Sequence, residues 1–347
     1  MSATVEASAP DLGPEPVTTR PRGVRFPFAR HTYLFAVVLA GVLLVANLVK
    51  QPSFGATSQL AALAPLGIAA MASVPSIMSG RGGIDLSISP LMTLSGLLYA
   101  TQLQPNGVGG YVAVPVLMIV GALIGTLTGL LIVVVRLQPI VVTLAMFFVL
   151  TGLDLKLAPS PITVSGTWMV NFAGSMGPVP GGLVALAIPA ASWLLVTRLT
   201  SYGSLLRSVG GNDVTAYTSG VPVGAVRVLA YALGGAMAAV GGLVLIGLVS
   251  TAESGTSAAY TLIAVAAVAL GGLPLQGGGG GIVNALAGAA AIYLLQSLLG
   301  VFQVSQTWLQ VIYGAVLIGA VLFGAIAARD LKPVLDRKLV LDREEGR

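Results

Sequence analysis

Long uninterrupted apolar runs constrain this chain more than any other feature. Apolar residues make up 56% of its 347 residues and charged residues only 8%. A soluble domain carries about 25% charged residues, and a helix crosses a bilayer core with about 20 apolar residues. We therefore predict an all-α fold, a polytopic membrane helical bundle with about ten transmembrane helices. The spans are expected at residues 33–49, 57–79, 86–103, 110–135, 138–156, 181–198, 228–250, 258–273, 282–299 and 307–327.

The segments outside these runs are too short to build a core of their own. Residues 1–32 are rich in Pro and Arg and are expected to form a disordered cytoplasmic tail, and residues 328–347 a second cytoplasmic tail. Between them, residues 33–327 form one membrane domain, in which residues 199–227 make the longest internal cytoplasmic loop.

Basic residues predict the orientation, because Lys and Arg near span ends are retained in the cytoplasm. With the N-terminus inside, the far side holds only Lys50 and Lys156. The cytoplasmic side holds the basic residues of both tails and Arg81, Arg136, Arg198, Arg207 and Arg227. Both termini are then cytoplasmic. The positive charge matches what topology demands and is not interleaved with aromatic residues, so nucleic acid is not an expected partner.

The sequence lacks the residues that several kinds of catalysis and cofactor binding require. The chain has no cysteine, and the glycine run 277–281 does not end in Gly-Lys-Ser/Thr, so no phosphate-binding loop is expected. His31 is the only histidine and has no carboxylate cluster or nucleophile motif beside it. We therefore expect a protein that is not an enzyme and that binds no metal and no cofactor itself.

Residues 203–222 contain the signals of a short capped helix. Asn212 or Asp213 suits the N-cap, Gly220 suits a left-handed stop, and Pro222 blocks continuation. The pattern predicts a helix of less than two turns over residues 214–219, between the sixth and seventh spans. Such caps also occur in connectors that bind no partner.

A break between the second and third spans is predicted over residues 82–88. Gly82 and Gly83 disfavour helix, and Ser89 before Pro90 suits an N-cap followed by the first helical residue. Non-helical backbone at membrane depth must lie within protein or beside water. Asp85 is therefore expected to cap free amides or to line a pathway, with the structural role favoured.

Two further features concern the spans themselves. Pro139 and Thr143 lie one turn apart in the fifth span, where Pro would open the hydrogen-bond ladder and Thr would repair it or face a substrate. Gly121, Gly125 and Gly129 share one helix face, which favours packing within one bundle over a dimer seam. A second glycine junction at residues 271–275 resembles residues 82–86, and both are expected on the cytoplasmic side.

Three motifs in this order resemble the permease subunits of bacterial ATP-binding-cassette importers for ribose and related monosaccharides, which are close to those for branched-chain amino acids. The motifs are Gly82-Gly83-Ile84-Asp85-Leu86-Ser87, Gln138-Pro139-Ile140-Val141-Val142-Thr143-Leu144-Ala145, and Gly210-Gly211-Asn212 with Ala216 and Ser219-Gly220. The chain departs from the family at Tyr217, where a basic residue is frequent, and between Gly271 and Gly278, where the family has a more polar stretch.

The resemblance implies a subunit of the bacterial plasma (inner) membrane that forms the pathway for a small neutral solute. It implies that the loop at residues 207–220 docks on a cytoplasmic ATPase subunit, which binds ATP and Mg, and that a second permease copy or paralogue and an extracytoplasmic substrate-binding protein complete the assembly. The ATPase-coupling residues would be Arg207, Gly210, Gly211, Asn212, Ala216 and Gly220. The pathway residues would be Gly83, Asp85, Ser87, Pro139 and Thr143.

Other functions stay open at this point. A permease for branched-chain amino acids or nucleosides shares this architecture, and the solute is not fixed by the resemblance. A stand-alone secondary transporter would carry ionisable groups within its spans; here Asp85, Asp154, Lys156 and Glu253 are expected at span ends or in loops. An enzyme acting on lipids would need a catalytic cluster, which the sequence lacks.

Overall fold

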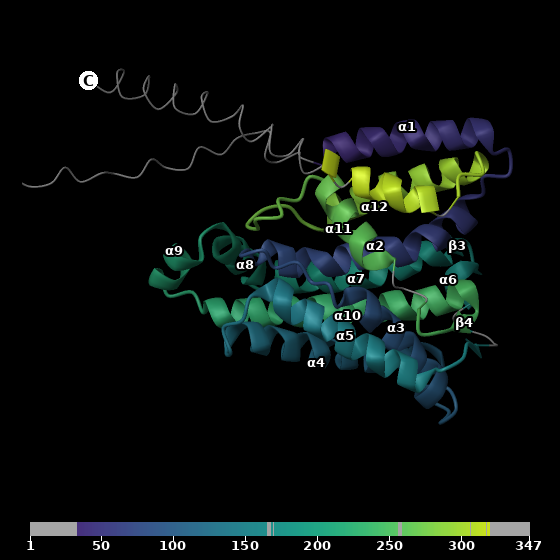
Figure 1. Cartoon of the computed structure of the whole chain (residues 1–347). Coiled ribbons are helices and arrows are strands. Elements are labelled where there is room, and N and C mark those ends of the chain that lie inside the picture. The colour runs from purple at the N-terminus through teal and green to yellow at the C-terminus, as the bar shows by residue number, and fades with distance from the viewer. Residues whose placement is uncertain are drawn as a thin grey trace, which may run out of the picture.

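The computed structural model describes residues 33–164, 168, 170–255, 259–305, 307–316 and 318–319. The two predicted tails, His31 and the end of the tenth predicted span lie outside them. Among the described residues the fold is helical, as predicted, with four strands of two residues each (Figure 1). The helices are α1 (Leu34–Lys50), α2 (Ala56–Met78), α3 (Ile88–Leu98), α4 (Ala113–Val133), α5 (Pro139–Leu157), α6 (Val170–Ala173), α7 (Gly181–Leu199), α8 (Tyr202–Gly211), α9 (Asp213–Thr218), α10 (Val223–Val249), α11 (Tyr260–Leu270) and α12 (Ile282–Val301).

Six helical segments in the described part of the chain are long and apolar enough to cross a membrane. They are α2, α4 with the preceding turn from Gly110, α5, α7, α10 and α12. Two further apolar helices are shorter, α1 with 17 residues and α11 with 11. Residues 307–316 and 318–319 are helical as well. A count of about ten spans and the orientation of the termini stay predictions.

Three predicted boundaries were wrong. The eighth span was expected over residues 258–273, but α11 ends at Leu270 and rises only about 16 Å. The seventh span was expected from residue 228, but α10 begins at Val223, so the predicted loop 199–227 ends five residues early. The third span was expected to have Ser89 as its cap, but α3 begins at Ile88 after Ser87 and continues as a π-helical turn over Tyr99–Leu103.

Two central helices, α2 and α10, organise the bundle. Almost every residue in the C-terminal halves of α2 and α10 is buried. Figure 1 shows the helices lying side by side, from α1 and α12 at one edge, through α2, to α4 at the other edge. At the first edge, the Asn47 amide of α1 donates to the Leu294 carbonyl of α12 at 2.9 Å.

Glycine allows α4 to lie directly against α10. A Cβ added at Gly121 or Gly125 would overlap a backbone carbonyl oxygen of α10. A Cβ at Gly129 would lie 2.8 Å from the Cα of Val228. The glycine face of α4 therefore packs within the bundle, which confirms the favoured interpretation of that stripe.

The two ends of the bundle carry different structures. At one end, α8 and α9 link the end of α7 to the start of α10 (Figure 1). At the opposite end, β1 (Ile162–Thr163) pairs antiparallel with β4 (Thr251–Ala252), and β2 (Ser175–Met176) pairs antiparallel with β3 (Val179–Pro180). The loops that precede α7 and α11 are joined there.

Candidate functional site

The loop between α7 and α10 contains two helices rather than one. The predicted short helix is α9, and its N-cap is confirmed, because the Asn212 side chain accepts a hydrogen bond from the Thr215 amide at 2.9 Å. Gly220 takes a left-handed φ of 81°, as predicted for the stop. The preceding helix α8 was not predicted. Its glycines and serines are weak helix formers, but Leu205, Leu206 and Val209 had the spacing of an amphipathic helix.

Backbone contacts fix α8 to the end of α2. A Cβ at Gly210 would overlap the carbonyl oxygen of Met78 and the amide nitrogen of Gly278. The Gly278 amide itself donates to the Met78 carbonyl at 3.1 Å. The two glycine junctions and α8 therefore meet at one place, and the prediction that both junctions lie on the same side is confirmed.

An ion-pair cluster joins α9 to both neighbouring elements. Asp213 Oδ2 lies 2.5 Å from Arg81 Nε and 3.0 Å from Arg227 Nη2. Burial raises the pKa of Asp213, but the hydrogen bond from Arg227 and the charges of Arg227 and Arg81 outweigh it, so the net pKa is lowered. Asp213 stays ionised at neutral pH and holds the start of α9 against the end of the bundle.

The outward side of α9 carries two large side chains beside the exposed Thr215 and Thr218. Val214 and Tyr217 lie one turn apart and have exposed fractions of 64% and 73%, whereas Ala216 has 5%. Gly211 has open space around its Cα, and Arg207 is exposed. Of the expected coupling residues, Ala216 and Gly210 hold the loop to the bundle, and Arg207, Gly211, Asn212 and Gly220 lie on its exposed side.

Four of the five expected pathway residues gather in a buried polar cluster. Asp85 accepts hydrogen bonds from the amide and hydroxyl of Ser87 at 2.9 and 2.6 Å. Thr143 of α5 donates to the Ile84 carbonyl at 3.1 Å. Gly83 packs so closely on the end of α2 that a Cβ there would overlap the Ser76 carbonyl oxygen. The capping role favoured for Asp85 is the role that the structure gives it.

The same cluster joins the starts of the two short helices. The hydroxyls of Ser89 in α3 and Thr261 in α11 are hydrogen-bonded, and the Thr261 hydroxyl also lies 3.4 Å from the Leu86 carbonyl oxygen. Both side chains are buried. The first turns of α3 and α11 therefore meet inside the bundle, where backbone groups outside a helix need partners of this kind.

Pro139 has a different place from the one expected. It is the first residue of α5, after the N-cap Gln138, so it opens no hydrogen bond within the helix. Thr143 consequently has no broken ladder to repair, and its hydroxyl lies 3.1 Å from the Ile84 carbonyl oxygen of the break after α2 and 3.4 Å from the Ile140 carbonyl oxygen of its own helix. Pro139 lines a cavity of about 550 Å³ beside Arg81, Arg136 and Arg227, apart from the other pathway residues.

Residues 55–321 match the family described as the permease component of the branched-chain amino acid transport system. This segment is most of the chain and includes both the loop around α9 and the polar cluster. The chain belongs to this permease family. It is therefore a transport component and a multi-pass protein of the inner membrane.

Curated relatives of this permease include sugar importers. Ribose import permease protein RbsC of Escherichia coli (strain K12) is 32% identical, and the alignment covers 68% of this chain and 75% of that protein. RbsC of Bacillus subtilis (strain 168) is 34% identical, and the alignment covers 68% of this chain and 74% of that protein. Galactose/methyl galactoside import permease protein MglC of Escherichia coli (strain K12) is 28% identical, with 68% of this chain and 76% of that protein covered. No solved structure matches the chain.

The permease contains a buried carboxylate whose burial was not predicted from the sequence. Asp154 lies near the end of α5, as expected, but its side chain is 1% exposed, and neither carboxylate oxygen has a hydrogen-bond partner among the described residues. The sequence signal was present, since Asp154 recurs with Leu150 and Met146 on the buried side of α5. The roles of Arg81, Asp213 and Arg227 were missed because the pairs join residues far apart in the chain.

Proposed function

We propose that the chain is the permease subunit of an ATP-driven importer and forms the pathway for ribose or a related monosaccharide. The similarity to ribose and galactose permeases over about two thirds of the chain carries this proposal. The low content of charged residues supports a neutral solute, because a desolvated charge in the pathway would need a compensating one.

The coupling surface is the exposed side of α8 and α9, with Arg207, Gly211, Asn212 and Gly220 at its surface. A cytoplasmic ATPase subunit with ATP and Mg docks there, and Val214 and Tyr217 supply the apolar contact. The support is mechanical: α9 is capped, and Asp213 ties it to both Arg81 and Arg227. A displacement of α9 is therefore transmitted through these ion pairs to the break after α2 and to the start of α10.

The polar cluster is the element that changes arrangement during transport. Gly83, Asp85, Ser87 and Thr143 lie where α3 and α11 begin, and hydroxyl contacts at such a junction can exchange partners without exposing charge to lipid. Alternating access requires an element with two discrete arrangements. Pro139, at the start of α5, borders the separate cavity that Arg81, Arg136 and Arg227 line.

The complete importer contains a pair of permease subunits and an external binding protein. Large apolar side chains cover the outer surfaces of α4 and α5, among them Leu123, Leu127, Phe148 and Val149. Lipid and a second permease copy share these surfaces. The binding protein docks at the end that carries β1 to β4, opposite α9.

Orientation is tested with single cysteines, since the chain has none of its own. Asn106 and Ser208 are both exposed and lie at opposite ends of the bundle. We expect Asn106→Cys to react with an impermeant thiol reagent from outside intact cells, and Ser208→Cys to react only after permeabilisation. Labelling of both from the same side would overturn the topology.

Uptake by proteoliposomes with the ATPase and binding protein tests the function. We expect ATP-dependent uptake of ribose, other pentoses or hexoses, and not of leucine or nucleosides. Gly211→Asp should abolish uptake while the protein still inserts, because a carboxylate would be placed on the docking surface. Gly211→Ala is the control, since its methyl group enters open space. Leucine or nucleoside uptake would favour the alternative permeases.

One observation favours a second candidate, a stand-alone secondary transporter. Asp154 is buried within α5 without a hydrogen-bond partner in the described residues, as an ion-coupling carboxylate would be. If this candidate holds, uptake proceeds without ATP and stops in Asp154→Asn. If the importer proposal holds, uptake without ATP is absent in both the parent protein and this variant.

A further inference from the structure

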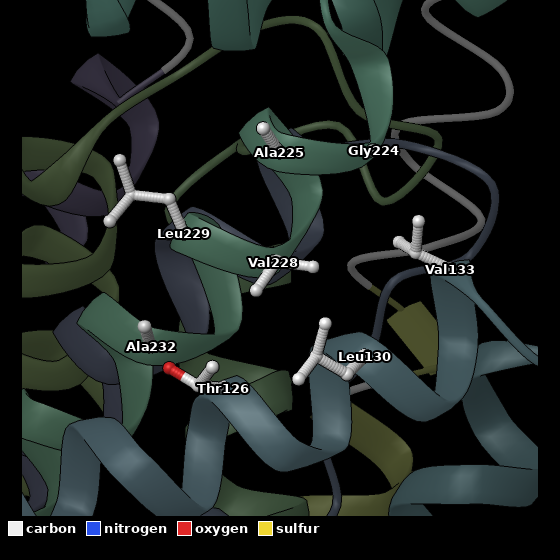
Figure 2. Close-up of a pocket in the computed structure, with 8 residues that line it drawn as sticks. All are labelled: Thr126, Leu130, Val133, Gly224, Ala225, Val228, Leu229 and Ala232. Carbon is white, nitrogen blue, oxygen red and sulfur yellow. The ribbon is translucent and has the colours of Figure 1, made fainter.

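A groove runs along the surface between α4 and α10. Its volume is about 450 Å³, and its lining is apolar apart from the hydroxyl of Thr126. Figure 2 shows Thr126, Leu130 and Val133 of α4 on one side and the side chains of α10 on the other. From Ala232 to Gly224 the groove follows α10 for about 12 Å. It has the size and the polarity of a site for a hydrocarbon chain.

A second, polar cavity continues this groove toward the end that carries α9. It has a volume of about 550 Å³ and shares Val133 and Gly224 with the groove. Three arginines line it, Arg81, Arg136 and Arg227. An apolar groove and a basic cavity thus adjoin at Val133 and Gly224.

The polar groups of the second cavity are not all satisfied by the protein. Within the described part of the chain, Asp213 is the one acidic partner of Arg81 and Arg227. With Arg136, the three arginines and Asp213 leave two positive charges. Tyr231 also lines this cavity; its side chain is 1% exposed, and its hydroxyl has no hydrogen-bond partner among the described residues. A buried hydroxyl left without a partner is costly.

We propose that this composite site binds an anionic phospholipid. Its phosphate lies among Arg136, Arg227 and the Tyr231 hydroxyl, and one acyl chain lies in the groove between α4 and α10. Arginine binds phosphate oxygens with paired N–H donors. Basic pockets between membrane helices suit lipid headgroups for this reason. The pocket lies where the arginine-rich helix ends meet the polar headgroups of the bilayer.

The bound lipid would also affect how α9 is held. Arg81 and Arg227 contact both the cavity and Asp213, so a bound phosphate and Asp213 share the same donors. A free phosphate ion would leave the apolar groove empty. A second permease copy would have to present a carboxylate or phosphate to the arginines and a narrow apolar segment to the groove at once.

Native mass spectrometry of the full chain, released from detergent, tests the site. The probes are phosphatidylglycerol and phosphatidylcholine with identical acyl chains, each added at equal concentration, and inorganic phosphate as competitor. We expect one phosphatidylglycerol per chain to be retained. Arg136→Gln should lower its occupancy at least fivefold, and Arg198→Gln, an exposed arginine at the same end but outside the cavity, should leave it unchanged.

The groove has its own pair of variants. Ala232→Phe fills the groove and should lower retention at least fivefold, while Ile119→Phe on the exposed side of α4 should have no effect. Tyr231→Phe removes only the hydroxyl and should lower retention about threefold, which keeps the test valid if a larger change impairs folding. Equal retention of phosphatidylcholine, displacement by millimolar phosphate, or retention unaffected by Arg136→Gln and Tyr231→Phe together would overturn the proposal. Since retention is measured without ATPase or solute, failure here leaves the proposed transport function intact.

Discussion

At the end of the bundle that carries α8 and α9, the glycines of α8 lie against backbone, whereas at the opposite end an aromatic cluster adds to the backbone contacts of Gly181 and Gly182. Gly210 lies against Met78 and Gly278 without room for a Cβ. At the far end, Trp168 packs edge-to-face on Tyr99, Tyr111 and Phe172, with ring centroids 5.3 to 5.8 Å apart. Backbone atoms in contact cannot move aside when a side chain is added, whereas side chains in contact can change rotamer. The glycine contacts of α8 should therefore transmit movement, and the aromatic cluster at the far end should absorb it.

The largest expected effect comes from Gly210→Val. The added side chain overlaps the Met78 carbonyl oxygen and the Gly278 amide, which belong to backbone and cannot move aside. Overpacking of this kind costs about 3 kcal/mol, and we expect the free energy of unfolding in an SDS titration to fall by about that amount. The matched control is Gly211→Val, whose Cβ enters open space. Equal stability of both variants would show that α8 is not held by backbone contact.

The next effect concerns charge. Asp213→Asn removes the negative charge shared by Arg81 and Arg227, and the Arg227 side chain is only 12% exposed. Leaving such a donor without its charged partner costs about 2 kcal/mol. Because the folded-state pKa of Asp213 is lowered, its contribution is complete above the ordinary Asp pKa of about 3.9 and is lost as the pH falls through the folded value.

The pH dependence of stability distinguishes loss of the Asp213 ion pairs from a general loss of stability. The parent protein should lose part of its stability in SDS titrations below about pH 4, and Asp213→Asn should lose less over the same interval because it has already lost the charge. An identical pH profile for parent and variant would contradict the ion-pair interpretation of this end.

Sequence reasoning succeeded where a structure is determined by neighbours in the chain. Asn212 and Gly220 act within α9, so their cap and stop followed from residue type and spacing. The break after α2 was predicted from Gly82 and Gly83 for the same reason. By contrast, α11 ends at Leu270 and is followed by residues that pack on Gly80 and α8, a tertiary contact that no local pattern encodes.

The same distinction applies to the candidate site. Asp85, Ser87 and Thr143 were singled out correctly as a group, but the partner that joins them to α11, Thr261, lies far along the chain. Asp213 was considered only as a cap, because its ion pairs depend on how α2 and α10 end at one place. Hydropathy identified the spans, but it did not reveal that Asp154 faces inward.

A smaller effect is expected at the aromatic end. The Trp168 ring nitrogen donates to the Tyr99 hydroxyl at 2.9 Å. Trp168→Phe removes that hydrogen bond but keeps an aromatic ring, which costs about 1 kcal/mol in the SDS titration. Combining it with Tyr99→Phe should add almost nothing, because each variant breaks the same bond. Fully additive losses would mean that the two rings contribute independently and that this end is more rigid than we infer.

The smallest expected effect sharpens the comparison within α9 itself. Asn212→Ala removes the bond to the Thr215 amide, and the loss of such a cap costs about 1 kcal/mol or less. Because α9 has six residues and keeps its ion pairs through Asp213, the change should stay local. Hydrogen exchange at Thr215 should become about fivefold faster, while the SDS midpoint of the whole chain hardly moves. Tyr217→Phe, a change at an exposed side chain of α9, is the control and should leave the Thr215 amide unchanged. If Asn212→Ala instead lowered global stability as far as Asp213→Asn does, the cap and the ion pairs would form one cooperative unit, and the rigidity of this end would depend on α9 as much as on the glycine contacts of α8.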